Sequence, residues 1–324
     1  MRIAGLLIAI FTATAALITP RAFACSACGC TLSSDWASQG LGTSGGWRFD
    51  ARFDFFDQDQ LREGTDSVAR SSLADPIERV PNDREVQQFT INRNYTLAAD
   101  YSVNRNWGVS VALPWFDRSH ATIAEGDSEI STSHDQGVGD ARVLARYAGF
   151  DDQHSTGIEF GLKLPTGHFT EPFESGPQQG ATLDRGVQLG TGTTDVLVGV
   201  YNFGAINPDW GYFAQALLQQ PLNSREDFRP GSGLNLNFGL RYTASATFVP
   251  QLQINARIEK REQGANADIE SSGATLMYLS PGFTWNFSRR FSAYVFAQAP
   301  LYQRVNGLQI EARWLGSVGL HYIF

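Results

Sequence analysis

Apolar and polar side chains alternate strictly in strand-length segments of this chain, and this alternation is the feature that most constrains its fold. In the clearest segment, apolar residues at the odd positions 47–55 alternate with Arg48, Asp50, Arg52 and Asp54. Successive side chains of a β-strand point to opposite faces. One face of this strand is therefore apolar and mainly aromatic, while the other face carries four charges. Lipid on one side and water on the other favour such a strand.

The same pattern recurs along the chain and predicts twelve strands, at residues 46–56, 86–103, 107–116, 136–149, 155–166, 188–203, 210–221, 231–244, 249–260, 273–287, 291–302 and 312–324. Around 195–203 and 291–299 both faces are apolar, so the pattern assigns no inside or outside there. After residue 24 no apolar run reaches the roughly 18 residues that a membrane-spanning helix needs. We therefore expect an all-β, up-and-down antiparallel transmembrane barrel.

The predicted connections alternate between short and long, as barrels with short periplasmic turns and longer outer loops require. The long connections are 57–85, 117–135, 167–187, 222–230, 261–272 and 303–311. Together they hold 22 acidic residues against ten Lys and Arg. This excess of acids predicts a negatively charged outer face, which can bridge to lipopolysaccharide through divalent cations.

The N-terminus predicts an exported protein. Arg2 precedes an apolar run over 3–18, and Ala22-Phe23-Ala24 fits the small-residue pattern before a signal-peptidase cut. We expect a signal peptide at 1–24, a cysteine-containing periplasmic arm or lumen plug at 25–45, and an outer-membrane barrel at 46–324. A cysteine at the first mature position also raises lipidation, but Ala22 and Phe23 depart from that motif.

The last predicted strand ends in alternating apolar residues closed by Tyr322 and Phe324. This pattern resembles the C-terminal signal that the outer-membrane barrel assembly machinery reads. With an even number of strands, both chain ends lie on the periplasmic side. Without Arg2 and Arg21 the chain keeps 23 Lys and Arg against 33 acids, a net charge of −10, which argues against nucleic acid as a partner.

Several short motifs add a family resemblance. They are GVGDAR at 137–142, LPTG at 164–167, LGTGTTD at 189–195, SPG at 280–282, QAPLYQ at 298–303 and VNG at 305–307. Their order and spacing resemble the outer-membrane family named for genes beside the meta-pathway of phenol degradation, whose members are described as transporters. The resemblance implies passage of small solutes. The glycines by themselves are explained by barrel architecture, since glycine allows close strand approach and positive φ.

The expected strand register places charged side chains of both signs inside the barrel, where they must pair or stay hydrated. A small-solute channel lined by these charges is one interpretation. A lumen filled and rigidified by the same charges, in a structural envelope protein without transport, is the other. The candidate pore-lining residues are Arg48, Asp50, Arg52, Asp54, Asp100, Asp140, Arg142, Arg146, Glu159, Lys163, Arg241, Arg257, Glu259 and Arg313.

The three cysteines, Cys25, Cys28 and Cys30, form a C-x-x-C-x-C cluster at the expected mature N-terminus. Thiolates suit Cu(I) or Zn²⁺, so a metal-binding or redox-linked arm is an alternative function. In the oxidising periplasm a disulfide between two of the cysteines is the competing expectation. Haem attachment is excluded, because Gly29 follows Cys28 where histidine is required.

No enzymatic activity is expected. The five histidines are scattered, and Ser133-His134-Asp135 are consecutive residues, which rarely converge as a catalytic triad. The loops lack repeats and long insertions, which weakens an adhesin interpretation.

Overall fold

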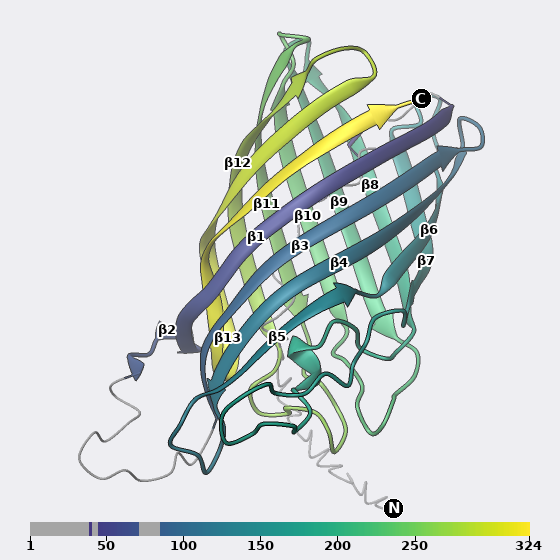
Figure 1. Cartoon of the computed structure of the whole chain (residues 1–324). Helices are drawn as coiled ribbons and strands as arrows, with labels where there is room; N and C mark the ends of the chain where they lie inside the picture. Colours follow the sequence, from purple (N-terminus) through teal and green to yellow (C-terminus); the bar gives the residue numbers. More distant parts are fainter. Residues whose placement is uncertain (1–38, 41–44, 71–84) are drawn as a thin grey trace, which may run out of the picture.

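The structure is a computed structural model that describes residues 39–40, 45–70 and 85–324 (Figure 1). The predicted signal peptide and the three cysteines lie outside the described residues. Within these ranges no helix is long and apolar enough to cross a membrane.

The chain forms one antiparallel sheet that closes into a barrel, as predicted, because the first and last strands pair (Figure 1). Each strand pairs with its neighbours in sequence order, with β2 at the end of β1 and β5 beside β4. The strands are β1 (Gly46–Gly64), β2 (Asp66–Ser67), β3 (Val86–Ser102), β4 (Trp107–Ile123), β5 (Ser131–Val138), β6 (Ala141–Tyr147), β7 (Thr156–Leu164), β8 (Asp195–Asn207), β9 (Trp210–Pro221), β10 (Gly233–Tyr242), β11 (Phe248–Glu259), β12 (Ala274–Asn286) and β13 (Phe291–Ile323).

The strand β13 supplies two of the barrel strands. Residues 292–305 pair with β12, and residues 305–323 pair with β1. The chain reverses at Gly307, whose φ of +55° lies in the left-handed region that glycine tolerates. When β5 and β6 count as one interrupted strand and β2 is left out, the described residues form twelve barrel strands, the number predicted.

The two ends of the barrel differ. At the turn end, where the C-terminus lies, brief connections join the strands, whereas the loop end carries longer ones (Figure 1). The strands β1 and β4 run further toward the loop end than predicted, to Gly64 and Ile123. Backbone pairing continues in these extensions although their outward side chains include polar residues. A rule based on apolar residues alternating at the lipid face does not predict such extensions.

Two other predicted strands differ in the structure. The strand predicted at 136–149 is longer and is interrupted at Gly139 and Asp140. The strand predicted from residue 188 begins only at Asp195. Residues 188–194 belong instead to the connection 165–194, which turns into the lumen. Gly192 has a φ of +72° there, a conformation that a regular strand does not contain.

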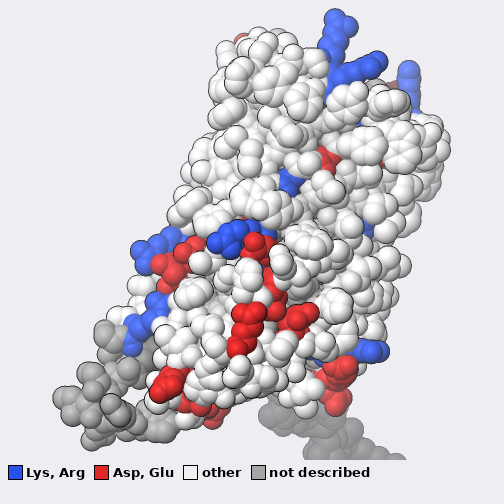
Figure 2. Space-filling view, in the orientation of Figure 1, with Lys and Arg blue, Asp and Glu red and all other residues white. Residues whose placement is uncertain are grey.

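Aromatic rings cover the outer face near the turn end, where they form a girdle typical of a membrane interface. The ring centroids of Trp47 and Tyr101 are 4.8 Å apart, and those of Trp210 and Tyr242 are 5.1 Å apart. Toward the loop end the outer face becomes charged at Asp117, whose Oδ1 lies 3.3 Å from Arg93 Nη1. Figure 2 shows a mostly uncharged upper face and a lower part where acidic side chains gather.

Inside the barrel, large rings lie flat across glycines of neighbouring strands. A Cβ atom added at any of these glycines would overlap the ring, so the pairs interlock; they are Tyr201 over Gly157, Phe213 over Gly239, Phe296 over Gly282, and Tyr294 over Gly319. This packing explains why 195–203 and 291–299 are apolar on both faces. Their inward rings cover the wall, and their outward apolar residues face the predicted lipid.

Candidate functional site

The lumen holds a cavity of about 330 Å³, bounded by inward side chains of most strands and by part of the connection 165–194. Of the fourteen predicted pore-lining residues, eleven border it: Arg48, Asp50, Arg52, Asp54, Asp100, Asp140, Arg142, Glu159, Lys163, Arg257 and Glu259.

The other three predicted residues lie elsewhere. Arg146 faces inward and contacts Asp100 beside the cavity. Arg241 is buried near the turn end, and its Nε and Nη1 have no hydrogen-bond partner among the described residues. Arg313 lies instead on the outer face, where its side chain is 67% exposed and its Nε is 3.1 Å from Asp59 Oδ1.

The reversed direction of Arg313 comes from a bulge. Phe56 pairs with Leu315, whereas Gln58 pairs with Ala312, so three residue steps on β13 face two on β1. A bulge places consecutive residues on the same face. Both Arg313 and Trp314 therefore point outward, and regular alternation assigned Arg313 to the wrong side.

One ionic cluster lies near the turn end. Asp100 accepts hydrogen bonds from both Arg48 and Arg146, which also donate to Ser102 Oγ at 2.6 Å each. Gly108 leaves room for the Arg146 guanidinium, because a Cβ there would overlap it. Two cations thus share one carboxylate across four neighbouring strands, β1, β3, β4 and β6.

A second cluster lies on β1 and β13. The Arg52 Nε donates to Asp54 Oδ2 at 2.8 Å, and Tyr294 Oη donates to Asp50 Oδ1 at 3.1 Å. Ser317 Oγ donates to the other oxygen of Asp54 at 2.6 Å. The alternating charges of β1 are therefore neutralised along the strand and by its neighbour, as buried charges require.

A third cluster joins the wall to the inserted connection. Lys163 Nζ lies 2.9 Å from Asp140 Oδ2 and 3.3 Å from Asp195 Oδ2, and all three side chains are nearly fully buried. Asp140 also accepts the backbone N–H groups of Gly167 and Thr191, at 3.1 and 3.0 Å. One carboxylate therefore holds both ends of the connection 165–194.

The glycine-rich motifs at 137–142, 164–167 and 189–195 meet at this point. A Cβ on Gly167 would approach Gly190 Cα to 2.8 Å and Gly139 Cα to 3.0 Å, so the three backbones pack directly. Thr166 Oγ1 accepts from Ala141 N at 2.9 Å and donates to Gly139 O at 2.7 Å. The motifs thus build an anchor for the connection, in agreement with their architectural interpretation.

The inserted connection narrows the lumen. A short 3-10 helix, η2 (Arg185–Val187), lies near its middle. Arg118 from β4 donates to Val187 O at 2.8 Å and to Gln188 O at 2.9 Å. Arg185 donates to Glu226 Oε2 at 2.5 Å, and its guanidinium lies 4.2 Å from the centre of the Phe169 ring.

Four charged residues near or lining the cavity were missed from the sequence: Arg118, Arg185, Asp195 and Glu262. Arg118 follows the apolar part of β4, Arg185 lies in a predicted loop, Asp195 closes a motif interpreted as architecture, and Glu262 lies in a predicted outer loop. Alternation within transmembrane segments gives no signal for them. The inward turn of the connection 165–194 has no local sequence signature.

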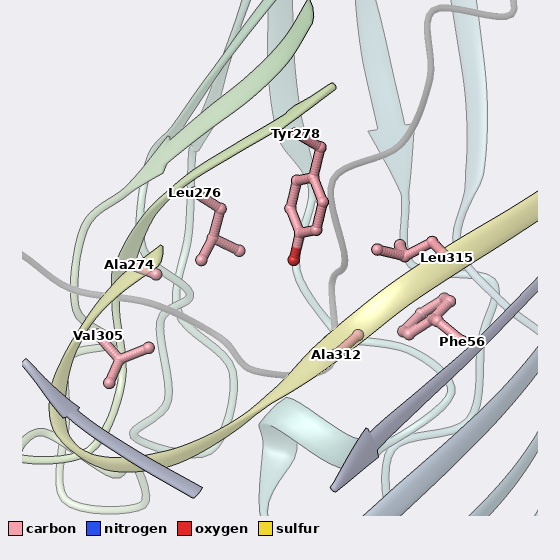
Figure 3. Packing of buried hydrophobic residues seen from close by; sticks show 7 residues of the cluster. All are labelled: Phe56, Ala274, Leu276, Tyr278, Val305, Ala312 and Leu315. Carbon is pink, nitrogen blue, oxygen red and sulfur yellow. The ribbon is translucent and has the colours of Figure 1, made fainter. Parts of the chain in front are cut away.

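One wall of the lumen near the loop end is apolar. A buried cluster on β1, β12 and β13 consists of Phe56, Ala274, Leu276, Tyr278, Val305, Ala312 and Leu315 (Figure 3). Phe56 and Leu315 from this cluster border the cavity, together with Leu217 and Phe228. The cavity therefore offers apolar contact beside its ionic clusters.

No metal site is found among the described residues, since no group of three His, Cys, Asp or Glu side chains there is arranged to hold an ion. Cys25, Cys28 and Cys30 lie outside these residues, so the predicted Cu or Zn site and the competing disulfide both stay predictions.

Comparisons with known proteins bear on the fold. No model of a protein family matches the chain, and no curated protein matches it. A crystal structure of an outer membrane channel from Pseudomonas putida F1 aligns with a TM-score of 0.65, at 11% identity, over 87% of this chain and 96% of that one. The chain therefore shares its barrel fold with that channel.

Two further solved structures align more loosely. The KdgM porin covers 86% of this chain and 99% of its own, at 12% identity and a TM-score of 0.41. The CymD monoaromatic hydrocarbon channel covers 87% and 89%, at 10% identity and a TM-score of 0.43. Membership of the phenol meta-pathway family stays a prediction.

Proposed function

We propose that the protein is an outer-membrane channel for small solutes. The cavity in the lumen carries this proposal. Among the described residues that line it, seven are Lys or Arg and seven are Asp or Glu. Such charges are tolerated in a barrel interior when they pair or remain hydrated. A lumen built only for rigidity is better filled with apolar side chains, as the cluster at Phe56 shows locally.

The balance of charge indicates how such a channel discriminates. Paired charges of both signs leave the cavity near neutrality, so neither anions nor cations are strongly excluded by net charge. Selection then depends on the width left by the connection 165–194 and on the groups that line the wall. The resemblance to the phenol meta-pathway family supports small organic molecules as the solutes.

The orientation and partners belong to the same proposal. We infer that the turn end is periplasmic and that the acidic loop end faces outward, where it meets lipopolysaccharide. The pairing of β1 with the last part of β13, which ends beside Tyr322 and Phe324, supports a role of this strand in assembly by the barrel machinery.

The arm at 25–45 is proposed to enter the lumen from the turn end. Two observations support this. Gln39 is buried, and Gly40 lies so close to the Phe203 ring that a Cβ there would overlap it. Phe203 is on β8 close to its turn with β9. A metal or redox function of the cysteines would then act at this mouth.

Solute uptake by proteoliposomes tests the channel. We expect purified protein to admit small neutral and charged organic solutes faster than protein-free liposomes, with uptake falling steeply as solute size increases. The Arg313→Ala variant, altered only on the outer face, is the matched control and should admit solutes like the unaltered protein. Folded protein that admits no solute would contradict the proposal.

A further inference from the structure

Uncharged side chains form a directional hydrogen-bond ladder around part of the lumen. Ser280 Oγ donates to Asn255 Oδ1 at 2.7 Å, and Asn255 Nδ2 donates to Asn237 Oδ1 at 2.8 Å. Asn237 Nδ2 then donates to Gln215 Oε1 at 3.1 Å, and Gln215 Nε2 donates to Glu159 Oε1 at 2.7 Å. The ladder therefore runs in one direction, from the Ser280 hydroxyl to the Glu159 carboxyl oxygen that accepts its last hydrogen bond.

The ladder spans half of the barrel wall. It begins on β12 and ends on β7, which are the outer members of six consecutive strands. Glu159 reaches across β8 because Gly199 stands between it and Gln215. A Cβ at Gly199 would come within 2.6 Å of Glu159 Oε1. The glycine thus lets the carboxylate close the ladder.

Two of the three amides in the ladder line the cavity. Gln215 and Asn237 both line it, and so does Asn235, the inward neighbour of Asn237 along β10. A primary amide has two N–H donors and an oxygen with two lone pairs. Within the described part of the chain, the ladder uses one donor and one lone pair of Gln215 and of Asn237. Each therefore retains one N–H donor and one oxygen lone pair that the ladder does not use.

The opposite wall is ionic, and its charges already have partners. Arg48 and Arg146 contact Asp100, and Arg52 contacts Asp54. A charged solute must compete with these buried pairs, whereas a hydroxyl group needs only the remaining amide donor and acceptor. Leu217 and Phe228 border the same cavity and offer apolar contact to carbon atoms.

We propose that this amide wall binds uncharged solutes with several hydroxyl groups, such as polyols or small saccharides. The inference rests on the proposed channel function and names its substrate class. A hydroxyl both donates and accepts, so neighbouring hydroxyl groups match neighbouring amides at Gln215 and Asn237. A solute without hydroxyl groups would displace water from these amides and leave them without hydrogen-bond partners, which costs free energy. The site therefore discriminates against such solutes.

The test uses the full chain in liposomes with two neutral solutes of similar size, xylitol and triethylene glycol. Xylitol carries five hydroxyl groups, whereas triethylene glycol has ether oxygens and only two. The Asn237→Leu and Gln215→Met variants keep the approximate side-chain volume and remove the hydrogen bonds. Gln263→Met, on an exposed loop residue, is the matched control.

We expect both lumen variants to lower xylitol uptake about five-fold, the equivalent of one hydrogen bond, while triethylene glycol uptake stays within about two-fold. The Gln263→Met protein should behave like the unaltered chain. Equal losses for both solutes, or no loss of xylitol uptake in folded variants, would overturn the inference. If the unaltered protein admits neither solute, the channel proposal fails separately. In that case, saturation-transfer NMR of xylitol with the protein in micelles tests the binding inference separately. The inference predicts a xylitol signal with the unaltered protein and no signal with Asn237→Leu.

Discussion

Lys163 Nζ donates to Asp140 Oδ2 at 2.9 Å, so a cation on the barrel wall pairs with the carboxylate that also binds the connection narrowing the lumen. Asp140 lies in the gap between β5 and β6, where the interrupted strand frees its carboxylate to bind the inserted chain at Gly167 and Thr191. A break in one strand thus becomes the attachment point of the constriction.

Replacing Lys163 by Met should weaken this attachment, because it removes the cation that pairs with Asp140 and that also donates to Thr191 Oγ1. Asp140 and Asp195 would then be buried without their cation, which costs about 3 to 5 kcal/mol of unfolding free energy. Urea unfolding of the barrel in lipid vesicles measures the loss. Trypsin should also begin to cleave after Arg185, which is buried in the unaltered protein. The exposed Lys260 provides the control, since Lys260→Met should change neither result.

The interlocked ring and glycine on β9 and β10 allow a double substitution. A Cβ at Gly239 overlaps only the fully buried Phe213 ring, so Gly239→Ala should destabilise the barrel by about 1 to 3 kcal/mol. Phe213→Leu in the same chain should recover part of that loss, because the smaller side chain leaves room for the methyl group. Urea unfolding of the unaltered protein, the two single variants and the double variant gives the coupling energy between the two positions. Strictly additive effects would show that the two side chains do not interlock.

The loop end should loosen as pH rises. Burial, together with the nearby charge of Asp184, raises the pKa of Glu85 to about 8 from its ordinary 4.5. Burial also raises the pKa of Asp268, although the charge of Arg261 acts to lower it. The charge of Asp268 in turn raises the pKa of both Glu85 and Asp184. Thr122 Oγ1 donates to Glu85 Oε1 at 2.6 Å and favours the ionised form.

The direction of this pH dependence follows from the linkage between proton binding and folding. The folded loops hold the Glu85 proton more tightly than the unfolded chain, so their stability is greatest below pH 4.5 and is lost as pH rises through 8. Hydrogen exchange of the loop-end backbone should therefore be faster at pH 9 than at pH 6, after correction for the intrinsic exchange rate. Glu85→Gln should remove most of this difference. Equal pH dependence in both proteins would refute the assignment to Glu85.

The outward ion pair of Arg313 should contribute little. The Arg313 and Asp59 side chains are 67% and 40% exposed, so solvent screens their attraction. Arg313→Ala should change the unfolding free energy by less than about 1 kcal/mol. Arg257→Ala should cost several times more, because its buried guanidinium bonds Glu259 at 2.7 Å and Asn235 at 3.0 Å. Similar losses for the two variants would mean that Arg313 is not on the outer face.

The strands of this barrel were predictable where lipid imposes alternation. The segment 47–55 and the part of the β3–β4 hairpin near the turn end follow the expected register, because their exposed outward positions are mostly apolar. Beyond Asp57 and Asp117 the strands continue with polar outward residues, and the sequence pattern no longer marks them. The extension of β1 pairs with β13, and the extension of β4 pairs with β3 and β5, so backbone pairing decides their length instead.

The lumen was less predictable than the wall. The bulge at residues 312–315 of β13, opposite Phe56 and Gln58, reversed Arg313, since one extra residue shifts alternation by one face. Arg185 approaches the cavity only because the connection 165–194 turns inward, and that turn depends on contacts among residues distant in sequence. The amide ladder likewise depends on side chains aligned across six strands, which no single segment reveals.

Planar-bilayer recording of the purified full chain tests the central claim most directly. The account predicts small, discrete conductance steps in potassium chloride for the unaltered protein, and larger steps for Lys163→Met, in which Asp140 has lost its paired cation and the constricting connection is held less firmly. Folded protein that gives no conductance steps, with or without that substitution, would contradict a solute channel through this lumen.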